Sequence, residues 1–331
     1  YWRDGDEVDD VREFAEFSPT VELAEIQKFL RAEDGRRDPE KPFFLIWAMN
    51  PPHMPFDQVP DTYKALYHEK PAEQLLNSPT LEGEGWREIP WLTEKRHLNF
   101  QAQAKQSVAD YFAQVSAVDA HVGEALKVLK DLSLDEETIF IFTSDHGELM
   151  GSQGLMYKGP WFKDALQVPF LIRWPHVLPA GVKETKTYIN PPDLFPTLLG
   201  ALGEEDKIPE TVTGRNLSRE LQQSIQALMT NSHDQASVSQ LEPSTETSAE
   251  TSSMTYGYYL NPALNARGIK DDAYFLVVIR NMHDEERYVL YDLKEDPDEL
   301  HNIAEEKDDL VRKYRERLEE WLVAHDDVWL R

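Results

Sequence analysis

The sequence contains no cysteine and no long apolar run. The absence of cysteine excludes disulfide bonds, thiolate metal sites and a cysteine nucleophile within this chain. No stretch approaches the roughly 18 consecutive apolar residues of a membrane-spanning helix. No signal peptide opens the chain, because the first residue is Tyr1 and residues 1–10 include five acidic side chains. We therefore expect the natural N-terminus to lie outside this chain.

Basic residues are scarce relative to acidic ones. The 331 residues include 34 Lys and Arg against 61 Asp and Glu, which gives a formal net charge of -27. Such a charge repels polyanions and argues against a nucleic-acid partner. It does not exclude a small anionic substrate, because a metal ion, a lysine and a histidine can reverse the field inside a pocket. The length suits one large domain, or a large and a small one.

The most informative segment is an apolar run over residues 139–142 that ends in Asp145, His146 and Gly147. We expect a buried parallel strand that delivers these side chains to the carboxyl edge of a sheet, where open α/β folds place their sites. Asp145 and His146 are candidate ligands of a divalent cation, since carboxylates suit Ca²⁺ or Mg²⁺ and imidazoles suit Zn²⁺ and other ions. The alternative is an aspartate that caps the next turn beside a solvated histidine.

A lysine follows the candidate ligands after a short interval. Lys158 lies in a segment with Gly151, Gly154 and Gly159, and glycine lets the backbone approach a ligand closely. The ammonium group of Lys158 can neutralise an oxygen of a sulfate or phosphate. The alternative is an exposed loop lysine without a ligand.

A histidine in the first third of the chain is the other candidate for contact with an oxyanion. His53 follows a predicted buried strand over 42–49 and two prolines, which stiffen its loop. It could donate a hydrogen bond or protonate a leaving group, or instead pack beside Trp47 or Phe56. Glu148 either orients a ligand or is a solvated loop acid.

The remaining pattern alternates helices and strands, which indicates an α/β layer architecture. Apolar periodicity predicts helices over 18–32, 105–132, 193–202 and 303–324. Continuous apolar runs predict strands over 42–49, 139–143, 168–175, 274–280 and 288–293. Ser18 is the expected cap of the first helix. Residues 231–253 are rich in Ser, Thr, Gln and Glu, which is typical of a mobile loop or insertion.

The order of several motifs resembles the sulfatase family, within the alkaline phosphatase-like superfamily. The motifs in the larger part are Asn-Pro-Pro-His-Met-Pro-Phe at 50–56, Val-Asp-Ala-His-Val-Gly at 118–123, Phe-Thr-Ser-Asp-His-Gly-Glu at 142–148, and Lys-Gly-Pro-Trp-Phe at 158–162. Further along are Asp-Leu-Phe-Pro-Thr-Leu-Leu at 193–199, Gly-Arg-Asn-Leu at 214–217, and Leu-Tyr-Asp-Leu at 290–293. The resemblance spans nearly all of the chain except about 60–100 and 225–256, and the ordered set is far more specific than any single motif.

The resemblance implies a fold and a set of roles. The fold would be α/β, an alkaline phosphatase-like mixed sheet sandwiched by helices, with a small α+β C-terminal subdomain. Residues 1–205 would be the remainder of the large domain, 206–256 a linker or insertion, and 257–331 the subdomain. Asp145 and His146 match two ligands of the family's divalent ion, usually Ca²⁺, and His53 and Lys158 match the side chains that contact the sulfate group.

The resemblance also implies a substrate and a place in the cell. The substrate would be a sulfate ester, on a small molecule such as an aryl sulfate or on an oligosaccharide. The family favours a periplasmic or extracellular location. An alternative is a phosphodiester or phosphonate ester hydrolase of the same superfamily, because the same side chains bind any tetrahedral anion. A third possibility is a nonenzymatic remnant that binds an anion or a partner.

The chain departs from the family pattern at the nucleophile. Sulfatases carry a Cys/Ser-x-Pro-x-Arg motif, whose first residue is oxidised to formylglycine, and a first strand with two more acidic metal ligands. Neither element is in this sequence, because Ser18-Pro19 and Ser78-Pro79 lack the intervening residue and the arginine, and no apolar strand precedes Asp9-Asp10. We therefore expect an N-terminally truncated sulfatase-like chain that does not turn over aryl sulfate by itself.

Overall fold

The computed structural model describes residues 16–89, 92–183, 188–223, 225–226 and 257–330. The chain forms two compact units, which are described separately. Unit 1 comprises residues 1–81 and 94–138, and unit 2 comprises residues 82–93 and 139–331. Within the described ranges, no helix is both long enough and apolar enough to cross a bilayer.

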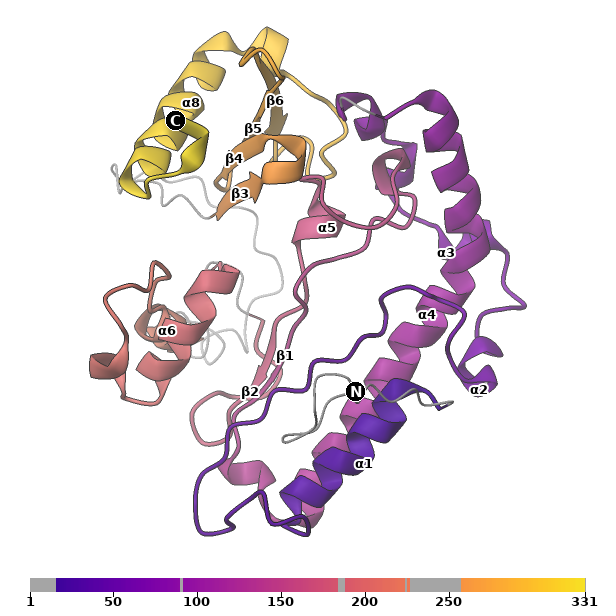
Figure 1. Ribbon diagram of the computed structural model, residues 1–331, viewed down its shortest axis with the longest axis vertical. Coiled ribbons are helices and arrows are strands. Elements are labelled where there is room, and N and C mark those ends of the chain that lie inside the picture. The colour runs from indigo at the N-terminus through magenta and orange to yellow at the C-terminus, as the bar shows by residue number, and fades with distance from the viewer. Residues whose placement is uncertain (1–15, 90–91, 184–187, 224, 227–256, 331) are drawn as a thin grey trace, which may run out of the picture. The chain divides into compact units, whose positions relative to one another are not determined.

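Unit 1 is built on the long helix α4 (Glu94–Asp131), against which α1 (Ser18–Leu30) packs (Figure 1). The short helices α2 (Asp61–Lys64) and α3 (Ala72–Leu75) also contact α4. The chain between α1 and α2 carries the loop with His53. Helix α4 therefore supports the segments that precede it in the sequence, and with them the candidate histidine.

Helix α1 buries the apolar stripe that the sequence predicts. Leu23, Ile26 and Leu30 are buried, which confirms this face of the helix. The expected cap is wrong, since Ser18 is the first helical residue and no side chain caps this end. Pro19 fits the first turn, where a missing N–H costs no helical hydrogen bond, so the helix starts before the serine can cap it.

Helix α4 begins well before residue 105, the predicted start, and its buried face is shifted from the predicted stripe. Val115 is exposed although its helical spacing places it on the predicted apolar face, which comprises Val108, Tyr111, Phe112, Val115, Val118, Val122, Leu126 and Leu129. The residues buried on α4 are Ala104, Val108, Ala113, Gln114, Ala117, Val118, His121, Ala125, Val128 and Leu129. Four of these ten residues are alanines, whose small side chains let a neighbouring element approach closely, whereas apolar periodicity gives more weight to large side chains.

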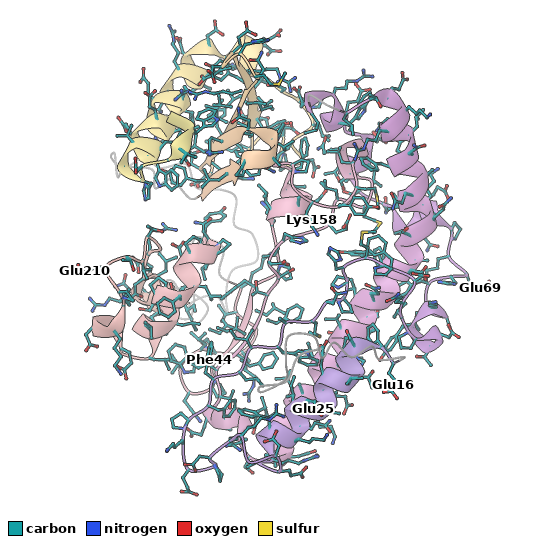
Figure 2. The ribbon with its side chains drawn as sticks, in the orientation of Figure 1. Glu16, Glu25, Phe44, Glu69, Lys158 and Glu210 are labelled. Carbon is teal, nitrogen blue, oxygen red and sulfur yellow. The ribbon has the colours of Figure 1, made fainter. Side chains whose placement is uncertain are left out.

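The predicted buried strand over 42–49 is wrong. No strand is assigned to these residues, and Phe44 and Ile46 are 78% and 73% exposed. Figure 2 labels Phe44 on this extended segment. An apolar run becomes a strand only when a neighbouring strand pairs its backbone, and none does so among the described residues. Residues 42–49 therefore have the apolar composition of a strand but no paired neighbour among the described residues.

The candidate metal ligands follow a short strand in unit 2. Strand β1 (Phe140–Phe142) pairs antiparallel with β2 (Leu171–Arg173), with Phe140 opposite Arg173. The predicted strands at these positions are confirmed, but the expectation of a buried parallel strand is wrong, because β1 is only half-buried. Its described partner follows it in the sequence, and the intervening segment reverses the chain direction.

Two further helices of unit 2 follow the candidate ligands. Helix α5 (Lys163–Leu166) lies between Lys158 and β2, and α6 (Pro191–Ala201) confirms the predicted helix near 193–202. Asn190 and Asp193 form a reciprocal cap at the start of α6. Asp193 also accepts hydrogen bonds from the backbone N–H of Arg215 at 2.8 Å and from its guanidinium at 2.9 Å. These bonds join the Gly-Arg-Asn-Leu motif at 214–217 to the Asp-Leu-Phe-Pro-Thr-Leu-Leu motif in α6.

The C-terminal part of unit 2 is a four-stranded antiparallel sheet with one long helix across a face (Figure 1). The strand order is β3 (Gly257–Asn261), β4 (Ala266–Lys270), β5 (Tyr274–Arg280) and β6 (Glu286–Asp292). The predicted strands β5 and β6 are confirmed, and so is the closing helix α8 (Asp308–Ala324).

The sheet and α8 share an apolar core. Its buried members include Ile269, Leu276, Val278, Leu290, Leu318 and Leu322. Leu276 and Leu290 face each other across β5 and β6. Burying each such side chain contributes roughly 1.5–3 kcal/mol, so this core is a rigid base for the segments that contact it.

Several short 3₁₀ turns complete the described chain. They are Pro79–Glu82, Gly85–Glu88, Asp135–Glu137, Ser152–Gly154, Glu205–Lys207, Pro262–Leu264, Ala304–Glu306 and Val328–Leu330. Residues 218–223 and 225–226 are also helical. The predicted mobile loop at 231–253 lies outside the described residues. The two units do not follow the predicted domain boundaries at residues 205 and 256. These domain boundaries stay a prediction.

Candidate functional site

Asp145 and His146 follow β1 directly, and their side chains lie side by side. Nε2 of His146 is 3.5 Å from Oδ2 of Asp145. The other carboxylate oxygen, Oδ1, accepts hydrogen bonds from the His146 N–H at 3.0 Å and from the Ser144 hydroxyl at 3.2 Å. The turn after the strand thus brings the two predicted ligands to one point, as a shared cation requires.

The electrostatics of this pair favour a charged carboxylate. Burial acts to raise the pKa of Asp145, but the charge of His146 and the hydrogen bonds from His146 and Ser144 outweigh it, so that pKa is lower than usual. The Asp145 side chain is mostly exposed. It is therefore an anionic oxygen ligand that a cation can reach.

A hydrogen bond fixes the tautomer of His146. Nδ1 lies 2.8 Å from the carbonyl oxygen of Gly147, and because a carbonyl can only accept, Nδ1 carries the proton. In the neutral ring, Nε2 then holds the lone pair next to the Asp145 carboxylate. Metal-binding histidines are commonly oriented by such a contact on their other nitrogen.

The donor set fits part of a divalent-cation shell. One carboxylate oxygen and one imidazole nitrogen converge, and both are accessible to an ion. Across the part of the chain that the structure describes, no group of three or more His, Cys, Asp or Glu residues could hold a metal. Asp145 and His146 would therefore hold Ca²⁺ only as two ligands among others.

Glu148 organises the loop that leads from the ligands to Lys158. Its Oε1 accepts hydrogen bonds from the backbone N–H of Met150 at 3.1 Å and of Tyr157 at 2.6 Å. Burial raises the pKa of Glu148, and these two donors and the charges of Lys158 and His146 only partly offset the rise. These contacts contradict the prediction of a solvated loop acid, while the predicted orientation of a ligand stays a prediction. The direct target of Glu148 is the loop backbone.

Lys158 follows this loop and is exposed (Figure 2). The preceding residue, Tyr157, has a φ of 68°, in the left-handed region, and its N–H is bound by Glu148. The next residue, Gly159, has a φ of 111°, which an L side chain rarely adopts. Glycine at 159 thus allows the chain to turn sharply beside the lysine, and the predicted close approach of a ligand to this backbone stays a prediction.

His53 belongs to unit 1, so the structure describes its surroundings apart from those of the other three candidates. It lies on an exposed turn, where its N–H donates to the Asn50 carbonyl at 3.0 Å. Its Nδ1 donates to the Met54 carbonyl at 2.8 Å, which fixes the ring tautomer. The predicted loop position is confirmed, and the predicted contact with an anion stays a prediction.

A buried glutamine on α4 holds the His53 loop. Nε2 of Gln114 donates to the carbonyl oxygens of Pro55 at 2.9 Å and Phe56 at 3.0 Å. Phe56 packs edge-on against Tyr111, with ring centroids 5.8 Å apart. Gln114 was not among the predicted site residues. The available signal was a polar residue on a face of α4 whose other buried residues, apart from His121, are apolar.

We expect Gln114→Leu to loosen the His53 loop. It leaves the carbonyls of Pro55 and the buried Phe56 without their donor, which costs about 1–3 kcal/mol of stability. Hydrogen exchange measured by mass spectrometry should speed up in peptides covering 53–57. Gln106→Leu, the same change at an exposed position of α4, is the control and should leave that exchange unchanged. Equal exchange in the two variants would contradict the role of Gln114.

Comparison with known proteins identifies the family. The sulfatase family model matches residues 7–204, and the model of the N-sulphoglucosamine sulphohydrolase C-terminal region matches residues 151–324. The first of these spans more than half of the chain and includes His53, Asp145, His146 and Lys158.

Relatives and solved structures agree with the family models. The endo-4-O-sulfatase of Bacteroides thetaiotaomicron is 31% identical over 329 residues, which are 95% of this chain and 58% of that protein. The arylsulfatase of Clostridium perfringens is 33% identical over 190 residues, or 55% of this chain and 38% of that protein. A crystal structure of yidJ from Bacteroides fragilis, assigned as a sulfatase, matches with a TM-score of 0.72 at 26% identity, over 94% of this chain and 59% of that one.

The chain therefore spans less than two thirds of the length of each of these proteins. The structural match confirms the predicted α/β fold of the alkaline phosphatase-like type. Together, the motifs, the fold and the family models place the chain unambiguously: it belongs to the sulfatase family.

Proposed function

We propose that this chain carries the cation-binding and anion-binding residues of a sulfuric ester hydrolase. The observation that carries the proposal is the pairing of His146 Nε2 with the Asp145 carboxylate at 3.5 Å, on the segment that continues to Lys158. Membership of the sulfatase family supports it. Asp145 and His146 are proposed as ligands of Ca²⁺, and Lys158 and His53 as contacts of the sulfate group.

The proposed chemistry follows from the charges of these side chains. A bound Ca²⁺ would supply positive charge to the sulfate oxygens. Lys158 would neutralise a second oxygen, and its backbone is held by the Tyr157 N–H bond to Glu148. His53, whose Nδ1 donates to the Met54 carbonyl, would contribute a hydrogen bond to the sulfate or a proton to the leaving group. The sequence holds no cysteine and no Ser-x-Pro-x-Arg motif, so these residues bind and stabilise but do not attack sulfur.

We propose a sulfated carbohydrate or an aryl sulfate as the substrate of the complete site. The relatives named as an endo-4-O-sulfatase and an arylsulfatase support these two classes. The formylglycine nucleophile belongs to the same proposal and would have to come from residues outside this sequence. A periplasmic or extracellular location also stays a proposal.

Sulfate binding tests the proposal, because it does not require the nucleophile. We expect inorganic sulfate, titrated calorimetrically into the chain of residues 1–331 with Ca²⁺ present, to bind in the millimolar range, near -4 kcal/mol. Lys158→Ala should weaken binding by about tenfold, which is the loss of roughly 1.4 kcal/mol from one charged contact. Lys294→Ala removes the same charge from an exposed turn and should change the affinity little.

Two results would contradict this expectation. Equal losses in Lys158→Ala and Lys294→Ala would mean that sulfate responds only to net charge. Binding that is unchanged in Lys158→Ala would remove the lysine from the anion site. Inorganic phosphate, titrated in the same way, distinguishes a sulfate site from a general site for tetrahedral anions.

A further inference from the structure

The backbone beside Lys158 is held by the C-terminal sheet. The carbonyl oxygen of Gly159 accepts two hydrogen bonds from side chains of β3, one from the Tyr259 hydroxyl and one from Nδ2 of Asn261 at 2.6 Å. These residues follow Gly159 by about 100 positions in the sequence, yet both belong to unit 2 with it. Two donors from one strand on one carbonyl fix the direction of that carbonyl, and with it the Gly159–Pro160 peptide, one peptide beyond the one that follows Lys158.

Each donor is itself held in place. Tyr259 is buried, and its ring packs edge-on against Trp161, with centroids 6.3 Å apart. Burial raises the pKa of Tyr259 far above its usual range, so its hydroxyl stays a donor at neutral pH. Oδ1 of Asn261 accepts the backbone N–H of Leu264 at 3.0 Å. Other contacts therefore already order both side chains, so their bonds to the Gly159 carbonyl carry little further entropic cost.

The segment around Lys158 is joined to the C-terminal part at other points as well. Nε1 of the fully buried Trp161 donates to the Tyr291 hydroxyl of β6 at 3.3 Å. Oε2 of Glu299, a buried residue, accepts the backbone N–H of Lys163 at 2.7 Å. Its Oε1 forms an ion pair with Lys270 of β4 at 2.9 Å. The C-terminal part thus also restrains residues 161–163, which follow Gly159 in the sequence.

The backbone that precedes Lys158 is restrained as well, both by Glu148 and through Gln153. Glu148 binds the N–H of Tyr157, the residue that precedes the lysine. Gln153, also buried, donates to the carbonyls of Asp298 at 3.0 Å and Glu299 at 3.1 Å. Lys158 therefore projects from a short backbone segment that is restrained at the Tyr157 N–H on one side and at the Gly159 carbonyl on the other, although the residue itself is exposed.

We propose that Tyr259 and Asn261 are positioning residues for Lys158, through which the C-terminal sheet sets the affinity of the anion site. The proposal rests on the proposed function, because it assumes that Lys158 contacts the anion. Holding the lysine backbone in one conformation removes an entropic cost from anion binding. Without the two donors, the Gly159 peptide gains freedom that the anion must then restrict.

Two conservative variants test the proposal in the chain of residues 1–331. Tyr259→Phe removes only the hydroxyl. Asn261→Asp keeps Oδ1 for the Leu264 N–H but loses the donor to Gly159. The control is Tyr288→Phe on β6, which removes a hydroxyl that donates to Glu286 at 2.7 Å, away from the Gly159 carbonyl. Hydrogen exchange in peptides covering 155–162 reports on the loop, and calorimetric titration of inorganic sulfate with Ca²⁺ reports on the site.

We expect the double variant to exchange faster in 155–162 by about tenfold or more, and to bind sulfate about three- to tenfold more weakly. Each single variant should show a smaller rise in the exchange rate and a smaller loss of sulfate affinity. Tyr288→Phe should lose stability without either effect, which separates positioning from general destabilisation. Unchanged exchange in the double variant would overturn the proposal. Faster exchange with unchanged sulfate affinity would also overturn it, because the contacts would then serve stability alone.

Failure of the proposed function gives a different result. If the unsubstituted chain binds no sulfate while Ca²⁺ is present, the assignment of Lys158 to an anion site fails, and the inference that depends on it is overturned too. If sulfate binds and Lys158→Ala weakens it, but the Tyr259 and Asn261 variants do not, only the positioning role is overturned.

Discussion

Gly147→Ala is expected to disrupt the segment that carries the two candidate metal ligands. A Cβ atom at Gly147 would lie 2.0 Å from the carbonyl oxygen of Asp164 and 3.3 Å from Cα of Ala165. The Gly147 N–H donates to the Ala165 carbonyl at 2.9 Å, so the two backbones are already in contact. Neither can yield easily, because the neighbouring Lys163 N–H is bound by the buried Glu299. We expect a loss of about 2–4 kcal/mol in the free energy of unfolding.

The measurement is urea unfolding of the chain of residues 1–331, with hydrogen exchange to locate the damage. Peptides covering 144–149 and 163–166 should exchange faster, and the apparent Ca²⁺ affinity should fall with them. Gly123→Ala is the matched control, because nothing lies within 4 Å of a Cβ at that position on α4. It should be neutral or stabilise the helix by up to about 1 kcal/mol. If Gly147→Ala were as well tolerated as Gly123→Ala, the close backbone approach would be wrong.

The parts of the candidate site that depend on neighbouring residues could be predicted from the sequence. Asp145 and His146 are neighbours in the sequence, and a single turn after β1 is enough to bring their side chains to 3.5 Å. The φ of 111° at Gly159 is likewise a property of one residue, although the glycines of this segment were interpreted as allowing close approach of a ligand. Helix α8 was predictable because its apolar stripe has the helical period.

The remaining features depend on partners that are distant in the sequence. No local pattern links Gly159 to Tyr259 and Asn261, which lie on a strand that the sequence analysis missed. Strand β3 was missed because its five residues, Gly-Tyr-Tyr-Leu-Asn, contain neither a long apolar run nor a strict alternation of apolar and polar residues. The run over 42–49 shows the converse, because its apolar residues are not paired by any described strand. Pairing is a long-range property, and apolar composition alone does not specify it.

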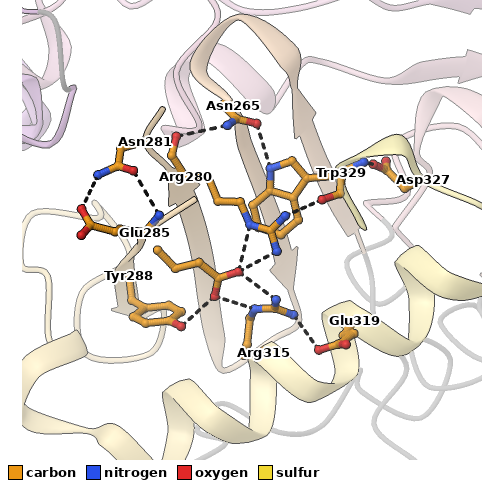
Figure 3. Close-up of polar contacts among 10 residues, drawn as sticks. Asn265, Arg280, Asn281, Glu285, Tyr288, Arg315, Glu319, Asp327 and Trp329 are labelled. Carbon is orange, nitrogen blue, oxygen red and sulfur yellow. Dashed lines mark hydrogen bonds and ion pairs between the residues drawn. The ribbon is translucent and has the colours of Figure 1, made fainter. Parts of the chain in front are cut away.

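Glu286→Gln is expected to destabilise the C-terminal sheet in a pH-dependent way. The Glu286 carboxylate accepts hydrogen bonds from Arg280 at 3.0 Å, Arg315 at 2.8 Å and the Tyr288 hydroxyl at 2.7 Å (Figure 3). The Arg280 guanidinium also lies 3.8 Å from the ring centroid of Trp329. A neutral amide would leave two half-buried guanidinium groups without their common anion. We expect a loss of about 2–4 kcal/mol at neutral pH.

The pH dependence follows from the pKa of this carboxyl. Burial acts to raise the pKa of Glu286, but the hydrogen bonds from Arg315, Tyr288 and Arg280 lower it from 4.5 to about 2. Because the folded pKa is lower than the unfolded one, the stabilisation is complete above about pH 4.5 and is lost as the pH falls through about 2. The shift corresponds to roughly 3 kcal/mol, which agrees with the loss expected for the substitution.

Urea unfolding at several pH values tests this linkage. The difference in stability between the unsubstituted chain and Glu286→Gln should be largest near neutral pH and should shrink steadily as the pH falls from about 4.5 toward 2. Glu285→Gln is the control, because it removes the same charge from the adjacent, exposed residue, whose carboxylate contacts only Asn281 in Figure 3. It should cost less than about 1 kcal/mol. A difference that stayed constant from neutral pH to about pH 2 would show that the loss comes from packing and not from the charge of Glu286.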